Sequence, residues 1–98
     1  MKLRYTERAI EDLEAIQSYI AQHNPSAALG VGRRVKDAIE LLVDFPGLGR
    51  ASRFDKIRVL LVAATPYAVY YSVRPRAREV VILHIRHGRR SPARRKEL

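Results

Sequence analysis

The tripeptide Asn-Pro-Ser at residues 24–26 constrains this 98-residue chain more than any other feature, because it ends one helix and begins another. The side chain of Asn24 can cap a helix N-terminus, and Pro25 suits the first helical position, where a missing N–H costs nothing. Residues 7–23 and 25–44, on either side, both carry apolar side chains at helical spacing, and Thr6 can cap the first segment. Two amphipathic helices with so short a link predict an antiparallel helix hairpin.

Three alternating runs follow the second helix and predict strands at residues 57–63, 67–74 and 78–86. Their links are short enough for antiparallel hairpins, and a shorter alternating run at residues 3–5 precedes the first helix. The sequence therefore predicts an α+β fold with a short N-terminal strand, the helix hairpin, and a three-stranded antiparallel meander packed on the helices. We expect a single domain over residues 1–98, with a basic C-terminal tail at residues 88–98.

Because strand side chains alternate, the predicted sheet has two different faces. We expect the helices to cover the face that carries Ile57, Val59, Leu61, Tyr67, Val69, Tyr71, Val73, Val81, Leu83 and Ile85. The opposite face then carries Arg58, Leu60, Val62, Tyr70, Ser72, Arg74, Val80, Ile82, His84 and Arg86. This mixture is too apolar for open water and too charged for a core, so it predicts a docking surface for another chain. The alternatives are that the tail or the N-terminal strand folds over it, or that the protein self-associates.

Positive charge is concentrated in the second half of the chain. The sequence has 19 Lys+Arg and 10 Asp+Glu, for a net charge of +9. From Arg58 onward, ten Lys or Arg residues stand against only Glu79 and Glu97. Such a field attracts polyanions, so the candidate partners are nucleic acid, the ribosome or an acidic protein segment. A basic surface kept for solubility is the alternative.

Several classes of protein are disfavoured by the composition. There is no cysteine, and the three histidines are scattered without a clustered carboxylate, so we expect no metal and no cofactor. No run of about 18 apolar residues occurs, and acidic side chains stand where a signal peptide needs its apolar stretch. We therefore expect a cytoplasmic protein without membrane contact.

Four stretches in order are AIEDLEAIQSYIAQHNPSAA, LLVDFPGLGR, TPYAVYYSV and VVILHIRHGRRSP, at residues 9–28, 41–50, 65–73 and 80–92. Together they resemble the RelE/ParE superfamily of toxins from bacterial type II toxin–antitoxin modules. The resemblance spans nearly the whole chain. It implies a compact α+β toxin that is held inactive, in a hetero-oligomer, by a cognate antitoxin encoded by an adjacent gene.

The superfamily has two branches with different actions. RelE-like members cut mRNA on the ribosome, whereas ParE-like members inhibit DNA gyrase without cutting nucleic acid. Metal-free RNA cleavage needs acid–base groups and cations around the phosphate. The residues that meet those needs here are His84, His87, Arg58, Arg74 and Arg86. The ribonucleases usually place a tyrosine or histidine close to the C-terminus, and here no tyrosine follows Tyr71.

The helix hairpin, the GLGR turn and the PYAVYYSV strand are closer to the ParE-like branch. The resemblance therefore favours a binding inhibitor of DNA gyrase, which is not an enzyme. A metal-independent, ribosome-dependent mRNA endoribonuclease is the alternative, and a non-toxic nucleic-acid-binding module is a third possibility.

Two binding surfaces follow from these patterns. The end of the last strand delivers His87, Arg89 and Arg90 to one edge of the domain, where adjacent arginines can form forked contacts with carboxylate or phosphate. We expect this cluster to bind the target, with a tail that is free to order on a partner. We expect the antitoxin to contact Arg58, Leu60, Val62, Tyr70, Arg74, Val80 and Ile82.

Overall fold

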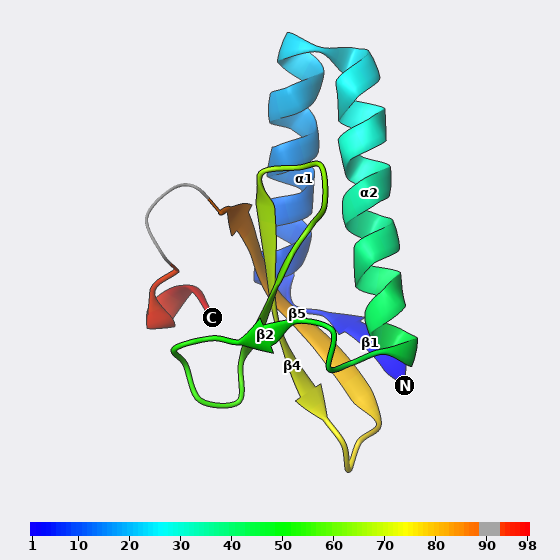
Figure 1. The fold of residues 1–98 in the computed structure, drawn as a ribbon. Coiled ribbons are helices and arrows are strands. Elements are labelled where there is room, and N and C mark those ends of the chain that lie inside the picture. The colour runs from blue at the N-terminus through cyan, green and yellow to red at the C-terminus, as the bar shows by residue number, and fades with distance from the viewer. Residues whose placement is uncertain (89–92) are drawn as a thin grey trace.

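Two helices cover one face of a five-stranded mixed sheet in residues 1–88 and 93–98, which the computed structural model describes (Figure 1). The elements in chain order are β1 (Lys2–Tyr5), α1 (Glu7–His23), α2 (Pro25–Asp44), β2 (Arg50–Ala51), β3 (Arg58–Leu61), β4 (Tyr67–Arg74), β5 (Glu79–His87) and a 3₁₀ helix, η1 (Arg95–Glu97). The strand order is β1-β5-β4-β3-β2, in which β1 runs parallel to β5 and the other pairs are antiparallel. The α+β class is confirmed, and β2 is an additional strand that the sequence pattern did not predict.

The helix hairpin forms where its capping residues predict it. Thr6 Oγ1 accepts a hydrogen bond from the Ala9 N–H at 3.1 Å, and Asn24 Oδ1 accepts one from the Ala27 N–H at 3.1 Å. The Asn24 N–H also donates to the Ile20 carbonyl at 2.7 Å. Asn24 therefore closes α1 and opens α2 at once, which sets the two helices side by side and antiparallel (Figure 1).

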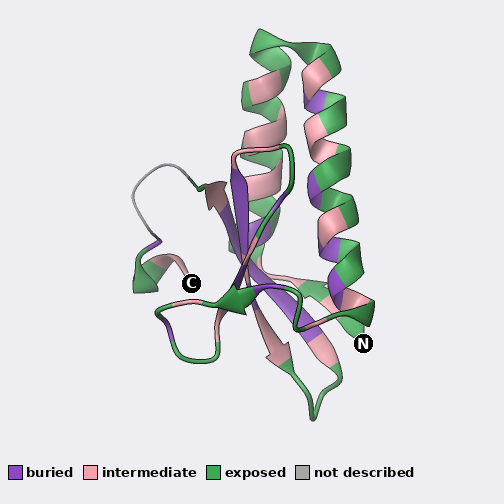
Figure 2. Ribbon diagram, viewed as in Figure 1, coloured by how far each residue is buried: buried purple, intermediate pink, exposed green. Residues whose placement is uncertain are grey.

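The core lies between the helix hairpin and the sheet. Its buried side chains are Ala9, Val35, Ile39, Leu42, Val62, Tyr67, Val69, Tyr71, Val80, Ile82 and Ile85. Figure 2 shows β4 and β5 buried through their centres, while the outer sides of both helices are exposed. Burial of each large aliphatic side chain contributes about 1.5–3 kcal/mol, so this layer is what holds the helices on the sheet. In the part of the chain that is described, no helix is both long enough and apolar enough to cross a membrane.

A β-bulge in β5 changes which of its side chains face the helices. His84 pairs with Tyr70, but Ile82 pairs with Tyr71, so Leu83 is an extra residue on β5. One inserted residue reverses the alternation of the strand beyond it. The β5 side chains that reach the core are consequently Val80, Ile82 and Ile85.

The predicted division of the sheet into two faces is correct for β4 and wrong for β3 and part of β5. Leu60 on β3 and Val62 just after it face the helices, and Leu61 is 59% exposed on the other side. On β5, Val80 and Ile82 also face the helices. Both sets of alternating residues at β3 are apolar, so the sequence pattern does not show which set faces the helices. Only the pairing with β4 decides this. We call the face away from the helices the open face; it carries Val59, Leu61, Ala68, Tyr70, Ser72, Val81, His84 and Arg86.

Helix α1 completes the edge of β5 where β1 ends. The Thr6 N–H donates to the Ile82 carbonyl at 3.0 Å, and Thr6 Oγ1 donates to the Leu83 carbonyl at 3.1 Å. Six residues further on, in α1, Asp12 Oδ2 accepts from the Ile85 N–H at 3.0 Å. The cap residue Thr6 and the side chain of Asp12 therefore take over from a strand partner and satisfy backbone groups of β5 at and beyond the bulge.

The turn after α2 is held by the hydroxyl of Tyr71, a residue with no exposed surface. This hydroxyl accepts from the Gly49 N–H at 2.8 Å and donates to the Pro46 carbonyl at 2.8 Å. A Cβ at Gly49 would lie 2.7 Å from the Tyr71 hydroxyl and 2.9 Å from the Val59 carbonyl oxygen. Only glycine leaves room for this contact, which explains the second glycine of the PGLGR sequence.

Removal of the Tyr71 hydroxyl should destabilise the fold. In Tyr71→Phe the Gly49 N–H and the Pro46 carbonyl lose their partner, which should lower the free energy of unfolding by about 1–3 kcal/mol in urea denaturation. Tyr70→Phe is the matched control, because the Tyr70 hydroxyl has no hydrogen-bond partner among the described residues. That control should change stability by less than about 0.5 kcal/mol. Equal losses in the two variants would contradict the role given to Tyr71.

Candidate functional site

A buried histidine is the centre of a charged cluster at the open face. His84 is 2% exposed, its Nδ1 lies 2.5 Å from Asp12 Oδ2, and its ring stacks on Tyr70 with a centroid separation of 6.1 Å. Because an ionised carboxylate can only accept, Nδ1 carries the hydrogen of this bond. The other ring nitrogen, Nε2, lies 3.7 Å from Glu97 Oε2 and has no hydrogen-bond partner among the described residues.

The carboxylate of Asp12 binds three partners. In addition to His84, Oδ2 accepts from the Ile85 N–H, and Oδ1 accepts from Arg8 Nε at 3.0 Å. Burial alone would raise the pKa of Asp12, but the hydrogen bonds from His84, Ile85 and Arg8 outweigh burial and hold that pKa below its usual range. Asp12 is therefore ionised at neutral pH.

A second carboxylate, that of Glu97, reaches the cluster from the C-terminal segment. Its Oε1 lies 2.9 Å from Arg86 Nη1 and accepts from the Arg94 N–H at 2.8 Å, while Oε2 lies 3.4 Å from Arg8 Nη2. The Arg94 N–H and then the Arg86 guanidinium lower the pKa of Glu97, against burial, which raises it. Glu97 thereby ties the C-terminal segment to α1 and β5. We call these residues the Asp12–His84 cluster: Arg8, Asp12, His84, Arg86 and Glu97.

Residues 93–98 lie against the open face (Figure 1). Ala93 is 1% exposed, and its carbonyl accepts from Arg53 Nη2 at 3.0 Å. Ala93 also lines a small cavity of about 300 Å³ with Phe54 and Tyr70. The prediction of a free tail is therefore wrong for residues 93–98, because a buried apolar anchor and the ion pairs of Glu97 hold them. The alternative that the tail folds over this face is confirmed for these residues.

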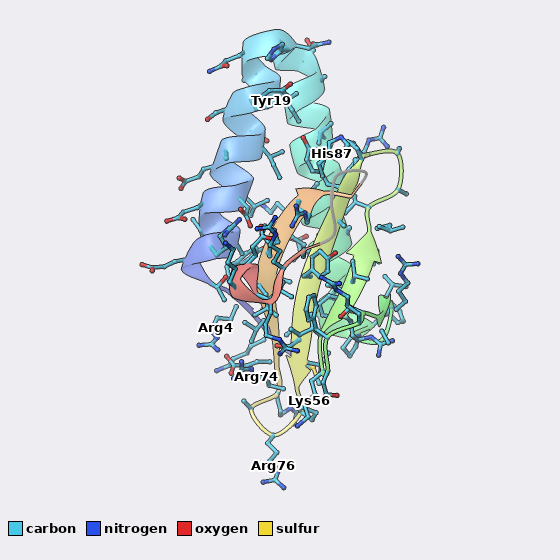
Figure 3. All side chains as sticks on the ribbon, turned by 90° about the vertical axis from the view of Figure 1, so that its left-hand side faces the viewer. Arg4, Tyr19, Lys56, Arg74, Arg76 and His87 are labelled. Carbon is cyan, nitrogen blue, oxygen red and sulfur yellow. The ribbon has the colours of Figure 1, made fainter. Side chains whose placement is uncertain are left out.

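Arg58 and Arg74 belong to a different surface. Both line a groove of about 1360 Å³ between the loop that precedes β3 and the β4–β5 turn. Figure 3 shows Arg74 at one end of the molecule with Lys56 and Arg76, and His87 toward the other end. His84 and Arg86 lie in the Asp12–His84 cluster. The five candidates for catalysis therefore fall into three separate places: Arg58 with Arg74, His84 with Arg86, and His87.

Two of these candidates have structural contacts of their own. Arg58 Nε donates to the Gly49 carbonyl at 2.8 Å and Nη2 donates to the Gly47 carbonyl at 3.2 Å, so this guanidinium holds the turn after α2. The His87 ring meets the Tyr67 ring edge-on, with centroids 5.9 Å apart. The other two residues predicted to bind the target lie outside the described residues; they are Arg89 and Arg90.

Most of the predicted antitoxin-binding residues are part of the core. Val62, Val80 and Ile82 are at most 4% exposed, and Leu60 packs against them. Their assignment to an open surface is wrong, because the phase of β3 and the bulge in β5 turn them toward the helices. Arg58 is engaged by the turn carbonyls. The two remaining members of the set keep accessible surface: Tyr70 is partly buried and Arg74 is exposed.

Sequence reasoning missed three members of the cluster, namely Arg8, Asp12 and Glu97. Asp12 had a local signal, because it stands three residues after Ala9 and four before Ile16, within the apolar stripe of the first helix. Glu97 had no local sequence signal, apart from being a lone acidic residue in a basic tail. Across the described residues, no group of three or more His, Asp or Glu side chains is arranged to hold a metal ion.

Comparison with known proteins gives consistent matches over most of the chain. The family model of the ParE toxin of type II toxin–antitoxin system, parDE, matches residues 3–92. Toxin RelE2 of Caulobacter vibrioides is 38% identical over 86 residues, which cover 88% of this chain and 93% of that protein. The chromosomal ParDE system from P. aeruginosa has a TM-score of 0.78 and 28% identity, over 89% of this chain and 95% of that one. The intact E. coli RelBE toxin–antitoxin complex shares the fold, with a TM-score of 0.69 and 14% identity over 91% and 98% of the two chains.

Replacement of Asp12 by asparagine should destabilise the protein. The amide keeps the shape of the side chain but loses the charge that His84 and Arg8 pair with, and it turns one acceptor into a donor. We expect a loss of about 2 kcal/mol or more in the free energy of unfolding at neutral pH. Glu14→Gln, on the exposed side of the same helix, is the matched control and should have an effect below about 0.5 kcal/mol. A loss no larger than that of the control would refute the account of Asp12.

The free energy of unfolding should depend on pH in the acid range through the ionisation of Asp12. The folded-state pKa of Asp12 is lowered, so its contribution to stability is complete above the unfolded-state value of about 3.9 and is lost as the pH falls through the folded-state value. The stability of the wild type should consequently fall more steeply below about pH 4 than that of Asp12→Asn. Urea denaturation at a series of pH values measures both curves. Parallel curves would mean that Asp12 is not held ionised by its partners.

Proposed function

This chain belongs to the family of ParE toxins of type II toxin–antitoxin systems, and we propose that it arrests growth by binding DNA gyrase. Gyrase inhibition is the action that the resemblance to the ParE-like branch implies. It requires a binding surface and no catalytic group. The observation that supports binding over cleavage is that His84 is buried and lies apart from Arg58 and Arg74 in the fold.

Metal-free RNA cleavage requires an acid–base group and cations around one phosphate. Arg58 and Arg74 line the groove at one end of the sheet, whereas His84 lies in the Asp12–His84 cluster. His84 is nearly fully buried, and Glu97 stands between it and the surface. A strand of RNA cannot reach the histidine and both arginines together in this arrangement.

The target-binding surface in this proposal is the end of β5 with the residues that follow it. His87 closes the strand, and its ring contact with Tyr67 suits a positioning role. Arg89 and Arg90 come next in the sequence and supply planar cations for forked hydrogen bonds to carboxylates of the target. The net charge of +9 favours fast association with an acidic partner surface.

We further propose that a cognate antitoxin, encoded by an adjacent gene, neutralises this toxin in a cytoplasmic hetero-oligomer. Two solved relatives by fold are described as toxin–antitoxin systems or complexes. Tyr70 and Arg74 remain candidates for the contact, since both keep accessible surface. The helix hairpin and the turn after it add exposed apolar side chains that a partner can cover: Ile10, Tyr19, Leu29, Leu41, Phe45 and Leu48.

Ribosome-dependent mRNA cleavage is the second candidate, and one observation favours it. Asp12 orients His84 as a carboxylate orients a catalytic imidazole, with Arg86 on the same face of the sheet. This pair would become a candidate for proton transfer if Glu97 moved away. A non-toxic nucleic-acid-binding module has less support, because Tyr70, the aromatic residue predicted to stack bases, already stacks on His84.

A supercoiling assay tests the proposal. Purified protein should inhibit DNA gyrase, and Arg89→Ala and Arg90→Ala should each weaken inhibition in a graded way, because a binding surface loses affinity one contact at a time. His87→Ala should have little effect. In cells, inducing the gene should stop growth, and co-induction of the neighbouring antitoxin gene should restore it. Normal supercoiling in the presence of folded protein would contradict gyrase as the target.

A further inference from the structure

The Asp12–His84 cluster contains more hydrogen-bond donors than its own carboxylates use. We propose that it is a binding site for a phosphate group, and that Glu97 of the same chain occupies the place of that phosphate in the structure. This site goes beyond the proposed function, because neither gyrase binding nor antitoxin contact requires it. The class of ligand is a phosphate monoester or inorganic phosphate.

The carboxylate of Glu97 is surrounded by donor groups from separate elements, as a bound anion would be. Three donors from three parts of the chain bind its carboxylate: Arg86 Nη1 at 2.9 Å, the Arg94 N–H at 2.8 Å and Arg8 Nη2 at 3.4 Å. His84 Nε2, which donates only when both ring nitrogens carry hydrogen, lies 3.7 Å away. Arg8 belongs to α1, while His84 and Arg86 belong to β5. Positive groups that are far apart in the sequence therefore converge on one anion.

The carboxylate does not satisfy these donors. His84 Nε2 and Arg86 Nε are both buried, and neither has a hydrogen-bond partner within the described residues. The distance of 3.7 Å from His84 Nε2 to Glu97 Oε2 is too long for a hydrogen bond. Buried polar nitrogens without a partner are uncommon, and these two point to a group that the chain itself does not supply.

A phosphate monoester suits the vacant donors better than a carboxylate does. It has three terminal oxygens in place of two, and at neutral pH it carries a charge of about −1.5 to −2. Its tetrahedral shape lets separate oxygens accept from Arg86 and Arg8 while a third faces His84 Nε2, where it accepts from an imidazolium or, as P–OH, donates to the neutral ring. A carboxylate is planar, so Glu97 reaches the arginines and leaves the imidazole out of range.

Two of the side chains are positioned without help from Glu97. Asp12 holds the His84 ring through Nδ1 and holds Arg8 through Nε at 3.0 Å. Tyr70 stacks on the imidazole. His84 and Arg8 therefore keep their positions when Glu97 leaves, and a phosphate group would enter a partly preorganised site.

Phosphate and Glu97 exclude one another, since both need the same donors. A bound phosphate would release Glu97 and with it the ion-pair anchor of residues 93–98 on the open face. In the wild-type protein this internal competition weakens the apparent affinity for phosphate. The affinity of the site becomes measurable when the competing charge is removed.

The test is the affinity for inorganic phosphate of the full-length Glu97→Gln protein, measured by isothermal titration calorimetry. This variant keeps the shape of the side chain and removes its charge, so it should bind phosphate about tenfold more tightly than wild type or better. Glu79→Gln is the matched control, because Glu79 pairs with Arg4 at the other end of β5. It should bind phosphate as weakly as wild type does.

Second-site variants show whether the gain comes from this pocket. Adding Arg86→Gln or Arg8→Gln to Glu97→Gln should remove most of the gain, and Arg8 is exposed enough that its loss leaves the fold intact. A 5′-phosphorylated dinucleotide that binds like inorganic phosphate would show that the site accepts a nucleotide end; binding of free phosphate alone would identify the ion itself as the ligand. The proposal is overturned if Glu97→Gln binds no better than Glu79→Gln, or if it binds acetate as tightly as phosphate. Neither outcome depends on gyrase, so failure here is separate from failure of the proposed function.

Discussion

The carboxylate of Asp12, placed on the free edge of β5, is the interaction on which the rest of the structure depends. Beyond Tyr5 the strand β1 gives β5 no further partner, and Asp12 accepts the Ile85 N–H in its place. The same carboxylate fixes His84 and Arg8. One side chain thus links α1 to β5, satisfies the edge of that strand and fixes the charged groups beside it. It stays ionised because its hydrogen bonds lower its pKa more than burial raises it.

From this attachment follows the arrangement of the surfaces. His84 and Arg8 present their remaining donors to the C-terminal segment, and Glu97 docks there. The docked segment covers part of the open face, while the basic groove with Arg74 stays at the other end of the sheet. His84 is covered, and Arg58 and Arg74 lie away from it, which is the basis of the gyrase proposal.

Local features of the sequence predict the parts of the fold that are stabilised locally. The helix hairpin follows from Thr6, Asn24 and Pro25, because capping acts within a few residues of the cap. Strand β4 follows from its pattern, since Tyr67, Val69, Tyr71 and Val73 share one phase and all pack in or against the core.

The errors arise where distant contacts decide the structure. Leu60 and Leu61 are equally apolar, so pairing with β4 is needed to choose which one faces the helices. The bulge at Leu83 depends on how α1 meets β5, and Asp12 and Ile85 are 73 residues apart. The contacts of Glu97 with Arg8 span 89 residues, which no periodicity can reveal. The charged cluster was therefore beyond prediction as a cluster, although His84 and Arg86 were singled out by their chemistry.

We propose that this toxin acts by binding and does not cleave RNA. The most direct test of this proposal is to incubate the purified, antitoxin-free protein with translating ribosomes that carry an end-labelled message, and to follow the length of the message. Our account predicts a message that stays intact at protein concentrations that inhibit gyrase. A message cut within the ribosome, with cutting lost in His84→Gln but retained in Glu14→Gln, would contradict it.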